Sequence, residues 1–204
     1  MPINLFVILA TNDKNISELE INSIIRNAKL IERYKKDIIN GKRKDLGREP
    51  YALVFEALVL KYLPKVKTQK EFKEKARFAT DKTFKKFVQG KYCNIAELDS
   101  RILIQICLGL TFTREESYDF FYVCGQNLYI KDDNCTERRI LDKLIIPLEE
   151  LEGLSEQDRN DRIYIHIYKA NNIFKKDTGR GLYVNCPREE QEAKEICEEL
   201  DIEF

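Results

Sequence analysis

The chain has 204 residues with 35 basic and 35 acidic side chains, so its net charge is zero. A balanced charge argues against indiscriminate coating of nucleic acids or membranes. Hydrophobic residues make up 43% of the chain, enough to bury a core in one large domain, which argues against global disorder.

The first apolar stretch, residues 3–10 (INLFVILA), is predicted to form a buried strand. No basic residue precedes it and no small-residue cleavage pattern follows it, so it lacks the pattern of a signal peptide. No apolar run approaches the ~20 residues of a membrane-spanning helix. We therefore expect no membrane partner.

Two helices are predicted next. Ser17 and Glu20 have the spacing of a capping box, and the helix that they open should end at Gly41. Pro50 suits the first turn of a second helix, which is apolar nearly all round and should be the most buried. The first helix has one apolar face, made of Ile21, Ile24, Ile25, Ala28, Ile31, Tyr34 and Ile38.

Two short helices are predicted between residues 68 and 90. Thr68 and Glu71 again have capping-box spacing. Thr80 can cap a helix over residues 81–89, which Gly90 ends.

Three further helices are predicted up to residue 147. One covers residues 95–110. The next is opened by Thr113 and Glu116, a third capping-box pair, and ends at Gly125. The last lies near residues 136–145 and is closed by Pro147.

After Pro147 the pattern changes. Residues 148–161 are acidic and read as irregular, and residues 162–170 (RIYIHIYKA) alternate strictly, which predicts a half-buried strand. On this strand His166 would lie at the surface. Residues 181–186 predict a second short strand, and Pro187 opens an acidic helix.

The expected fold is mainly α with a five-helix core. A small β element of N-terminal and C-terminal strands makes it α+β overall. We expect three parts: residues 1–48, an N-terminal strand and long helix; residues 49–147, a helical domain; and residues 148–204, an acidic β-β-α segment.

The cysteines predict neither a metal site nor a disulfide framework. None forms a C-x-x-C pair, and His166 is the only histidine, so we expect no metal. Residues 175–183 lack the spacing of a phosphate-binding loop, so no cofactor is expected. Several cysteines fall at apolar helix positions, which favours free thiols in a reduced, cytoplasmic protein. The six are Cys93, Cys107, Cys124, Cys135, Cys186 and Cys197.

Residues 51–126 resemble the Xre/lambda-repressor-like helix-turn-helix family. Thr68 and Gln69 match the usual opening of its second helix. TDKTFKKFVQGK at 80–91 is similar to its third helix and the glycine-lysine exit. LIQICLGLTFTREESYDFFYVCG at 103–125 looks like its fourth and fifth helices. The resemblance implies a helix-turn-helix domain.

The charges are unevenly distributed. Residues 61–91 hold eleven Lys or Arg and three Asp or Glu, a net charge of +8. Residues 131–204 hold twelve basic and nineteen acidic residues, a net charge of −7. Such a pattern is typical of a polyanion site with a separate acidic end, or of two segments that attract each other.

The predicted third helix places Phe84, Phe87 and Val88 on one side, so its lysines point outward. The resemblance implies that these outward positions meet base edges or phosphates. The alternative is a basic helix face that only contacts water. The loop at residues 42–44 is either a second polyanion contact or a solvated loop. The candidate nucleic-acid-binding residues are Lys82, Lys85, Lys86, Gln89, Lys91, Lys70, Lys42, Arg43 and Lys44.

We therefore expect a DNA-binding, transcription-regulator-like protein of bacterial or phage origin. Duplex DNA is the first expected partner. We expect no enzyme activity, because no sequence feature places a nucleophile near His166. The alternative is a protein-interaction module, such as a phage inhibitor or defence-associated adaptor, that binds a protein of nucleic-acid machinery. The acidic C-terminal helix could cover the basic face within the chain or in a homodimer, or be a solvated amphipathic helix.

Overall fold

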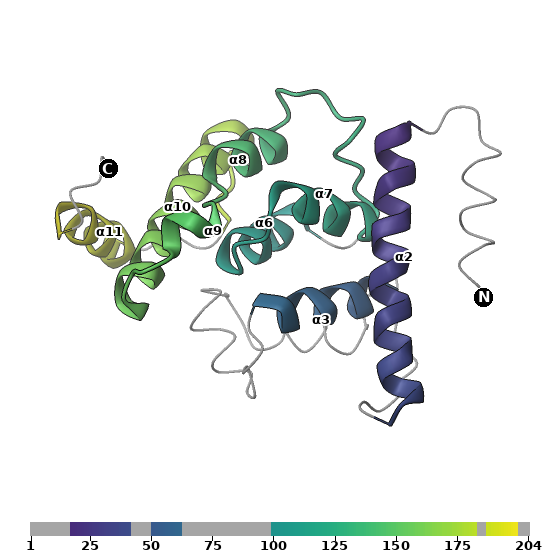
Figure 1. Cartoon of the computed structure of the whole chain (residues 1–204). Helices are drawn as coiled ribbons and strands as arrows, with labels where there is room; N and C mark the ends of the chain where they lie inside the picture. Colours follow the sequence, from purple (N-terminus) through teal and green to yellow (C-terminus); the bar gives the residue numbers. More distant parts are fainter. Residues whose placement is uncertain (1–16, 42–49, 63–98, 183–186, 200–204) are drawn as a thin grey trace.

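The structure is a computed structural model that describes residues 17–41, 50–62, 99–182 and 187–199. Within these ranges the fold is all-α, with eight helices and no strand (Figure 1). The predicted α+β class is therefore wrong for the described residues, because the stretch predicted as its main C-terminal strand lies inside a helix. The helices are α2 (Glu18–Ile39), α3 (Pro50–Tyr62), α6 (Ser100–Gly109), α7 (Arg114–Val123), α8 (Thr136–Leu144), α9 (Leu148–Leu151), α10 (Glu156–Thr178) and α11 (Pro187–Glu199).

The helices are arranged from α2 at one side to α11 at the other (Figure 1). α2 packs against α3 and α7, and α3 also packs against α7. α6 and α8 join this group to α10, and α11 lies against α10. One continuous core cluster runs through α3, α6, α7, α8 and α10, so these helices share their hydrophobic interior.

The predicted capping boxes of α2 and α7 are confirmed. The Glu20 amide donates to Ser17 Oγ at 3.3 Å, and the Ser17 amide donates back to the Glu20 carboxylate at 2.9 Å. Thr113 and Glu116 make the same reciprocal pair at 3.2 and 3.1 Å. These bonds satisfy donors that a helix start leaves unpaired, so a local signal was sufficient to place both starts.

α3, α8 and α11 are also found where the sequence predicts them. α3 begins at Pro50, and its Phe55 and Leu58 are almost fully buried, as expected for the most apolar helix. α8 ends at Leu144, three residues before Pro147. The predicted start of the next helix at residue 95 is wrong: α6 begins at Ser100, because the Asp99 carboxylate caps the helix by accepting from the Arg101 amide at 3.0 Å.

The predicted strand at residues 162–170 is wrong, because these residues lie in the middle of α10. The helix is buried on two sides, by the main core and by α11, so six of the nine residues in this stretch are apolar. The other three, Arg162, His166 and Lys169, recur at helical spacing. The alternation of Ile and Tyr therefore reflects two adjacent helical stripes rather than the two faces of a strand. One stripe, Ile163, Ile167, Ala170 and Phe174, belongs to the main core, and the other, Tyr164, Ile165 and Tyr168, packs with α11.

The caps of α10 confirm its helical state. Ser155 Oγ accepts from the Asp158 amide at 3.1 Å, so the helix begins inside the acidic stretch that the sequence analysis took as irregular. That stretch also contains α9. Gly179 ends α10 in the left-handed region, with φ of 74°, and its amide donates to the Lys175 carbonyl at 2.9 Å.

We expect Gly179→Ala to destabilise the protein by about 1 kcal/mol, because alanine adopts the left-handed conformation at a cost that glycine avoids. No atom lies within 4 Å of the added Cβ, so the effect is conformational rather than steric. Urea unfolding measures the loss of stability. The control is Lys176→Ala, which replaces an exposed residue near the same end of α10. Equal stability of both variants would contradict the cap.

The other predicted elements fall outside the described residues. These are the strand at 3–10, most of the strand at 181–186 and both short helices between 68 and 90. The division at residues 147 and 148 stays a prediction, and the core cluster holds residues from both sides of it. Among the helices that the structure describes, none is long and apolar enough to cross a membrane.

Candidate nucleic-acid interface

The structure describes the helices on either side of the candidate interface, but not the interface residues. All nine predicted contact residues lie in residues 42–49 or 63–98, which are outside the described ranges. The chain enters the second of these segments from the end of α3 and leaves it at Asp99, before α6. The described helices that flank this segment in the sequence are α3 on one side and α6, followed by α7, on the other.

The centre of this scaffold is a cluster of three buried aromatic rings. Phe120 of α7 stacks on Phe55 of α3, with ring centroids 6.1 Å apart, and meets Phe112 edge-on at 5.9 Å. All three side chains are at most 1% exposed. Aromatic pairs at such distances add to the free energy of area burial. The three rings therefore fix how α3 and the turn before α7 sit on α7.

The turn between α6 and α7 contains one strained residue. Thr111 has φ of 56°, a left-handed conformation that β-branched residues rarely adopt. Its hydroxyl donates to the Leu110 carbonyl at 2.7 Å, and the next amide, that of Phe112, donates to the Cys107 carbonyl at 3.0 Å. The reversal brings Phe112 into the core, so its burial offsets the backbone strain.

A polar seam joins α2 to α7. We use this name for Glu20, Ser23, Arg26 and Asn27 of α2 with Asp119, Asn127 and Tyr129. Arg26 donates two hydrogen bonds to the Asp119 carboxylate, at 2.5 and 2.9 Å. Tyr129 accepts from Arg26 at 2.9 Å and donates to Asp119 at 2.6 Å. The Asn27 amide group donates to the Asp119 backbone carbonyl at 3.0 Å.

Two groups of the seam, Arg26 and Tyr129, have raised pKa values. The hydrogen bonds to Asp119 raise the pKa of the Arg26 guanidinium, outweighing its burial. Burial first, and the Asp119 carboxylate second, raise the pKa of the Tyr129 hydroxyl. Arg26 is therefore a cation already matched by a buried anion, so the seam is a structural contact between helices and not a polyanion site.

Sequence reasoning missed the seam because it assigned the packing face of α2 from apolar residues alone. The residues of α2 that are buried against the body are mostly polar, and Ile21, Ile24 and Ile25 are only half-buried. The available signal was the spacing of Ser23, Arg26 and Asn27, which puts three polar side chains on one side of the helix.

Glu20 gives the seam a pH dependence. Burial on its own would raise the pKa of this carboxyl, but hydrogen bonds from Ser17 and Asn127 lower it below the ordinary value of 4.5 overall. A carboxyl whose folded pKa is depressed stabilises the fold above its unfolded pKa, and this contribution is lost as the pH falls through the folded pKa. We expect wild type to lose more stability than Glu20→Gln between about pH 6 and about pH 3. Urea unfolding at both pH values checks this, and equal losses would contradict it.

The cations of α7 and α8 are also paired. Asp142 accepts from Arg114 at 2.6 Å and from the Tyr118 hydroxyl at 2.9 Å. The guanidinium groups of Arg114 and Arg138 lie 5.1 and 5.7 Å from the centre of the Tyr118 ring. Arg138 also pairs with Asp133 at 2.5 Å. These arginines hold α7, α8 and the loop between them together, so they are poorly placed to bind phosphate.

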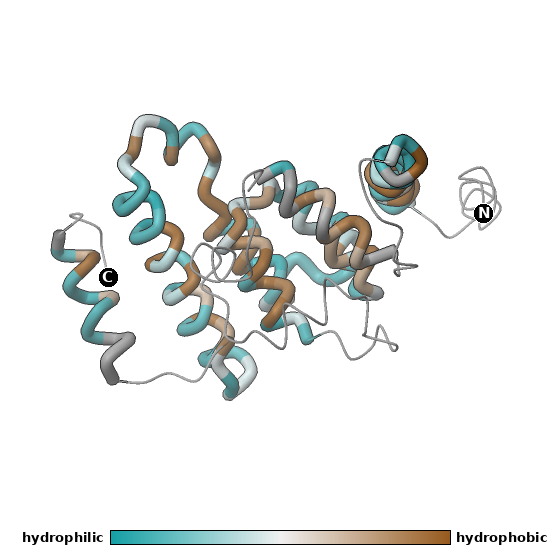
Figure 2. The backbone as a smooth tube through the Cα atoms, turned by 90° about the horizontal axis from the view of Figure 1, so that it is seen from below, coloured by the Kyte–Doolittle hydropathy of each residue, from teal (hydrophilic) through white to brown (hydrophobic). Residues whose placement is uncertain are grey.

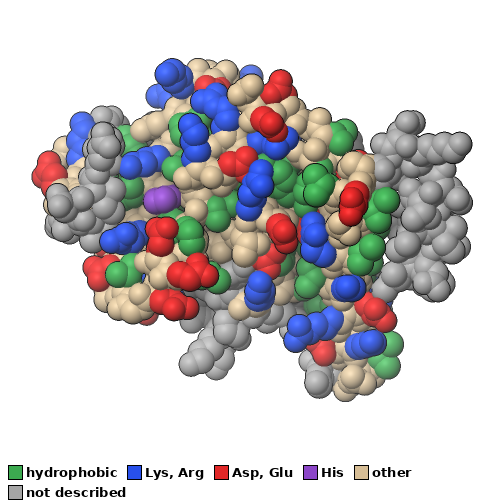
Figure 3. Space-filling model, turned by 45° about the horizontal axis from the view of Figure 1, so that its top comes forward, with side chains coloured by type: hydrophobic (Ala, Val, Ile, Leu, Met, Phe, Trp, Pro, Cys, Tyr) green, Lys and Arg blue, Asp and Glu red, His purple; other side chains and the backbone are tan. Residues whose placement is uncertain are grey.

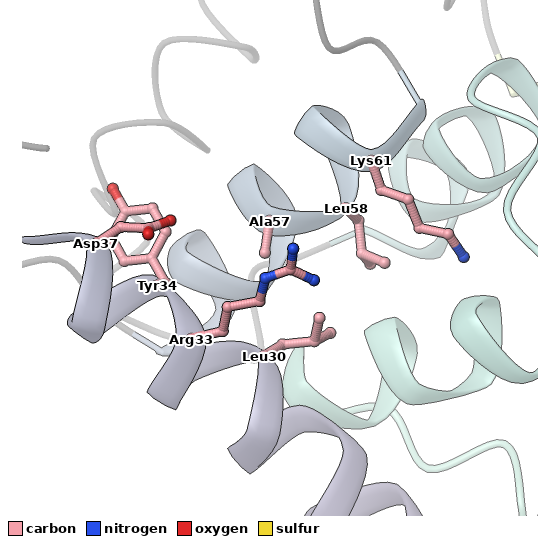
Figure 4. Close-up of a pocket in the computed structure, with 7 residues that line it drawn as sticks. All are labelled: Leu30, Arg33, Tyr34, Asp37, Ala57, Leu58 and Lys61. Carbon is pink, nitrogen blue, oxygen red and sulfur yellow. The ribbon is translucent and has the colours of Figure 1, made fainter. Parts of the chain in front are cut away.

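A small pocket lies between α2 and α3, next to the point where the chain leaves α3 (Figure 4). Its volume is about 290 Å³. The Arg33 side chain reaches from α2 toward α3 across it, and Lys61 forms an ion pair with Glu116 at 2.5 Å. Both signs of charge surround an apolar floor, so the pocket is not a dedicated anion site. The lining residues are Leu30, Arg33, Tyr34, Asp37, Ala57, Leu58 and Lys61.

The single histidine differs from its predicted position. His166 is half-buried in α10 rather than on a strand surface, and its Nδ1 lies 2.8 Å from the Leu144 carbonyl. Because a carbonyl oxygen only accepts hydrogen bonds, Nδ1 carries a proton and donates a hydrogen bond to this oxygen. Burial lowers the pKa of His166. The histidine thus helps to tie α10 to the end of α8.

The described cysteines are free thiols, and three of them are buried, as expected of small core residues. Burial raises the pKa of Cys107 to about 12 and that of Cys124 well above its usual range, so neither is an activated nucleophile. In the part of the chain that the structure describes, no group of three potential metal ligands comes together.

The acidic helix α11 docks on α10 through small and apolar residues. Ala193 and Cys197 are buried against Tyr164 and Tyr168, and Ile196 packs at the edge of this cluster. Its exposed side carries acids, namely Glu192, Glu195 and Glu198.

Comparisons with known proteins gave no match, either to a protein-family model, to a curated protein or to a solved structure. The helix-turn-helix resemblance therefore stays a prediction from the sequence.

Proposed function

We propose that the chain is a nucleic-acid-binding, regulator-like protein that presents residues 80–91 on a scaffold of α3, α6 and α7. The observation that carries the proposal is the packing of α3 and the α6–α7 pair around Phe120. In the helix-turn-helix resemblance these are the first, fourth and fifth helices. The intervening residues 63–98 have the length and the capping signals for the second and third.

The distribution of charge also favours this segment as the surface that contacts nucleic acid. Residues 61–91 carry a net charge of +8 in a chain of zero net charge. In contrast, the arginines of α7 and α8 and Arg26 of α2 are matched by carboxylates. Phosphate contacts supply most of the non-specific affinity of DNA-binding proteins, and lysine suits them as a compact point charge. Duplex DNA is therefore the proposed target.

A triple substitution of Lys82, Lys85 and Lys86 by alanine tests the proposal. Each phosphate contact contributes about −0.9 to the slope of log K against log salt on B-DNA. Losing three contacts should flatten that slope by roughly 2.7 and weaken binding on every sequence tested. Fluorescence anisotropy with a labelled duplex at several salt concentrations measures it.

The matched control replaces Lys143, Lys175 and Lys176 with alanine. These lysines are exposed on α8 and α10, and their loss changes the net charge by the same amount. The control should retain the wild-type slope. If the first triple variant also retains it, another basic patch binds the DNA, and residues 42–44 are the next to be replaced.

The exposed acids of α11 favour a second candidate, a module that binds a basic protein of nucleic-acid machinery. Glu192, Glu195 and Glu198 face solvent while the helix stays docked through its other side. Under this candidate, replacing the three with glutamine abolishes capture of a partner from a nuclease-treated host lysate, and the lysine variants do not. The nucleic-acid proposal instead expects the lysine variants, and not the glutamine variants, to weaken binding to duplex DNA.

A further inference from the structure

α2 carries an apolar stripe on a side that does not face the helical body. The stripe consists of Ile21, Ile24, Ile25 and Ala28, which recur at three- and four-residue intervals. The body-facing residues of α2 are Glu20, Ser23, Asn27 and Tyr34, all buried. At 100° per residue, the centres of the two sets lie about 120° apart around the helix.

The stripe is half-buried without belonging to the core. Leu30 and Ile31 of the same helix pack against the main core cluster, but none of the four stripe residues packs against either cluster. α2 lies at the edge of the molecule and is seen almost end-on in Figure 2. Hydrophobic side chains are visible along its outer side in the space-filling view (Figure 3). α3 and α7 contact α2, and Asn27, one of the body-facing residues, donates to the Asp119 carbonyl of α7.

We propose that residues 3–10, INLFVILA, dock on this stripe. The segment lies outside the described residues and contains seven apolar residues out of eight. Six residues, 11–16, link it to Ser17 at the start of α2, a span of at most about 20 Å. The stripe from Ile21 to Ala28 is about 10 Å long. The link therefore lets the segment reach every residue of the stripe.

The tether favours this occupant over a second copy of the chain. A segment joined by a short link is present at an effective concentration in the millimolar range. A second copy must instead overcome the loss of translational and rotational freedom on association. Docking would give α2 an apolar contact on a second side, away from the polar seam, and it would cover a half-buried apolar surface that favours aggregation. The inference concerns α2 alone and is independent of the nucleic-acid proposal.

Limited chymotrypsin cleavage of the full chain tests the docking. Cleavage after Leu5 or Phe6 is followed by mass spectrometry of the N-terminal fragments. Ile25→Asp puts a charge into the stripe and should accelerate this cleavage by about tenfold, because proteolysis follows the population of the undocked segment. Asn22→Asp adds the same charge on an exposed position of α2 and should leave the rate unchanged.

A milder variant and a mass measurement make the test decisive. Ile25→Ala preserves helix propensity and should accelerate cleavage several-fold, even if the aspartate variant unfolds α2. Equal cleavage rates for wild type and Ile25→Ala overturn the proposal. Light scattering gives the molar mass in parallel. If wild type is a dimer, and Ile25→Ala dissociates it without changing the cleavage rate, the stripe binds a second copy of the chain. That result also overturns the proposal.

Discussion

Phe120→Ala is expected to destabilise the protein by about 4 kcal/mol, the largest effect of any single substitution considered. The side chain is fully buried and contacts the rings of Phe55 and Phe112. Its loss leaves a cavity where α3, α7 and the turn before α7 meet, and that rigid junction is unable to close over it. Urea unfolding followed by circular dichroism measures the change.

Phe120→Leu is the control for this prediction. Leucine fills much of the same volume without the ring contacts, so its cost should stay below about 1.5 kcal/mol. A loss under about 1 kcal/mol for Phe120→Ala would show that α3 and α7 are not packed as described. If the proposed function is right, Phe120→Ala should also weaken duplex binding at temperatures where the variant is partly unfolded.

Arg26→Ala is expected to cost about 3 kcal/mol, the second largest effect. The Asp119 side chain is only 7% exposed, whereas that of Arg26 is 37% exposed. Removing the arginine leaves a buried carboxylate without its cation, and among the described residues Tyr129 alone continues to donate to it. Removing both partners in an Arg26→Leu, Asp119→Leu double variant should cost less than the sum of the two single changes, because no unpaired charge stays buried.

Arg33→Ala is the matched control on the same helix. Arg33 is exposed, so its loss should change the free energy of unfolding by no more than about 0.5 kcal/mol. Thermal or urea unfolding compares the two variants. If Arg26→Ala and Arg33→Ala are equally stable, the polar seam contributes nothing to holding α2.

The sequence predicts the described helices best where a short-range signal fixes an end. Ser17 with Glu20, and Thr113 with Glu116, form hydrogen bonds between residues three apart, so no distant partner is needed. Pro50 opens α3 by the same kind of local chemistry. These starts were placed correctly for that reason.

Tertiary contacts explain what the sequence could not predict. Residues 162–170 of α10 were taken for a strand because burial on two sides places two apolar stripes next to each other, so that Ile and Tyr alternate along the sequence. The polar residues Arg162, His166 and Lys169 recur at helical spacing, a signal that was overlooked. The caps at Ser155 and Gly179 were the better evidence. The packing face of α2 was misjudged because Asp119, the partner of Arg26, lies 93 residues away along the chain.

For the candidate site too, some features could be predicted from local signals in the sequence and others could not. The scaffold helices and their order follow from capping signals and from the apolar pattern. The outward direction of Lys82, Lys85 and Lys86 is a prediction from helical spacing alone, because these residues lie outside the described ranges.

Binding of the wild-type chain to a random-sequence duplex, measured by fluorescence anisotropy across a series of salt concentrations, tests the proposed function most directly. If Lys82, Lys85 and Lys86 each contact a phosphate, log K falls linearly with log salt with a slope of about −2.7 or steeper. Absence of salt-dependent binding to any duplex or single strand at low salt would contradict the account and assign the lysines to a solvated face or a protein interface.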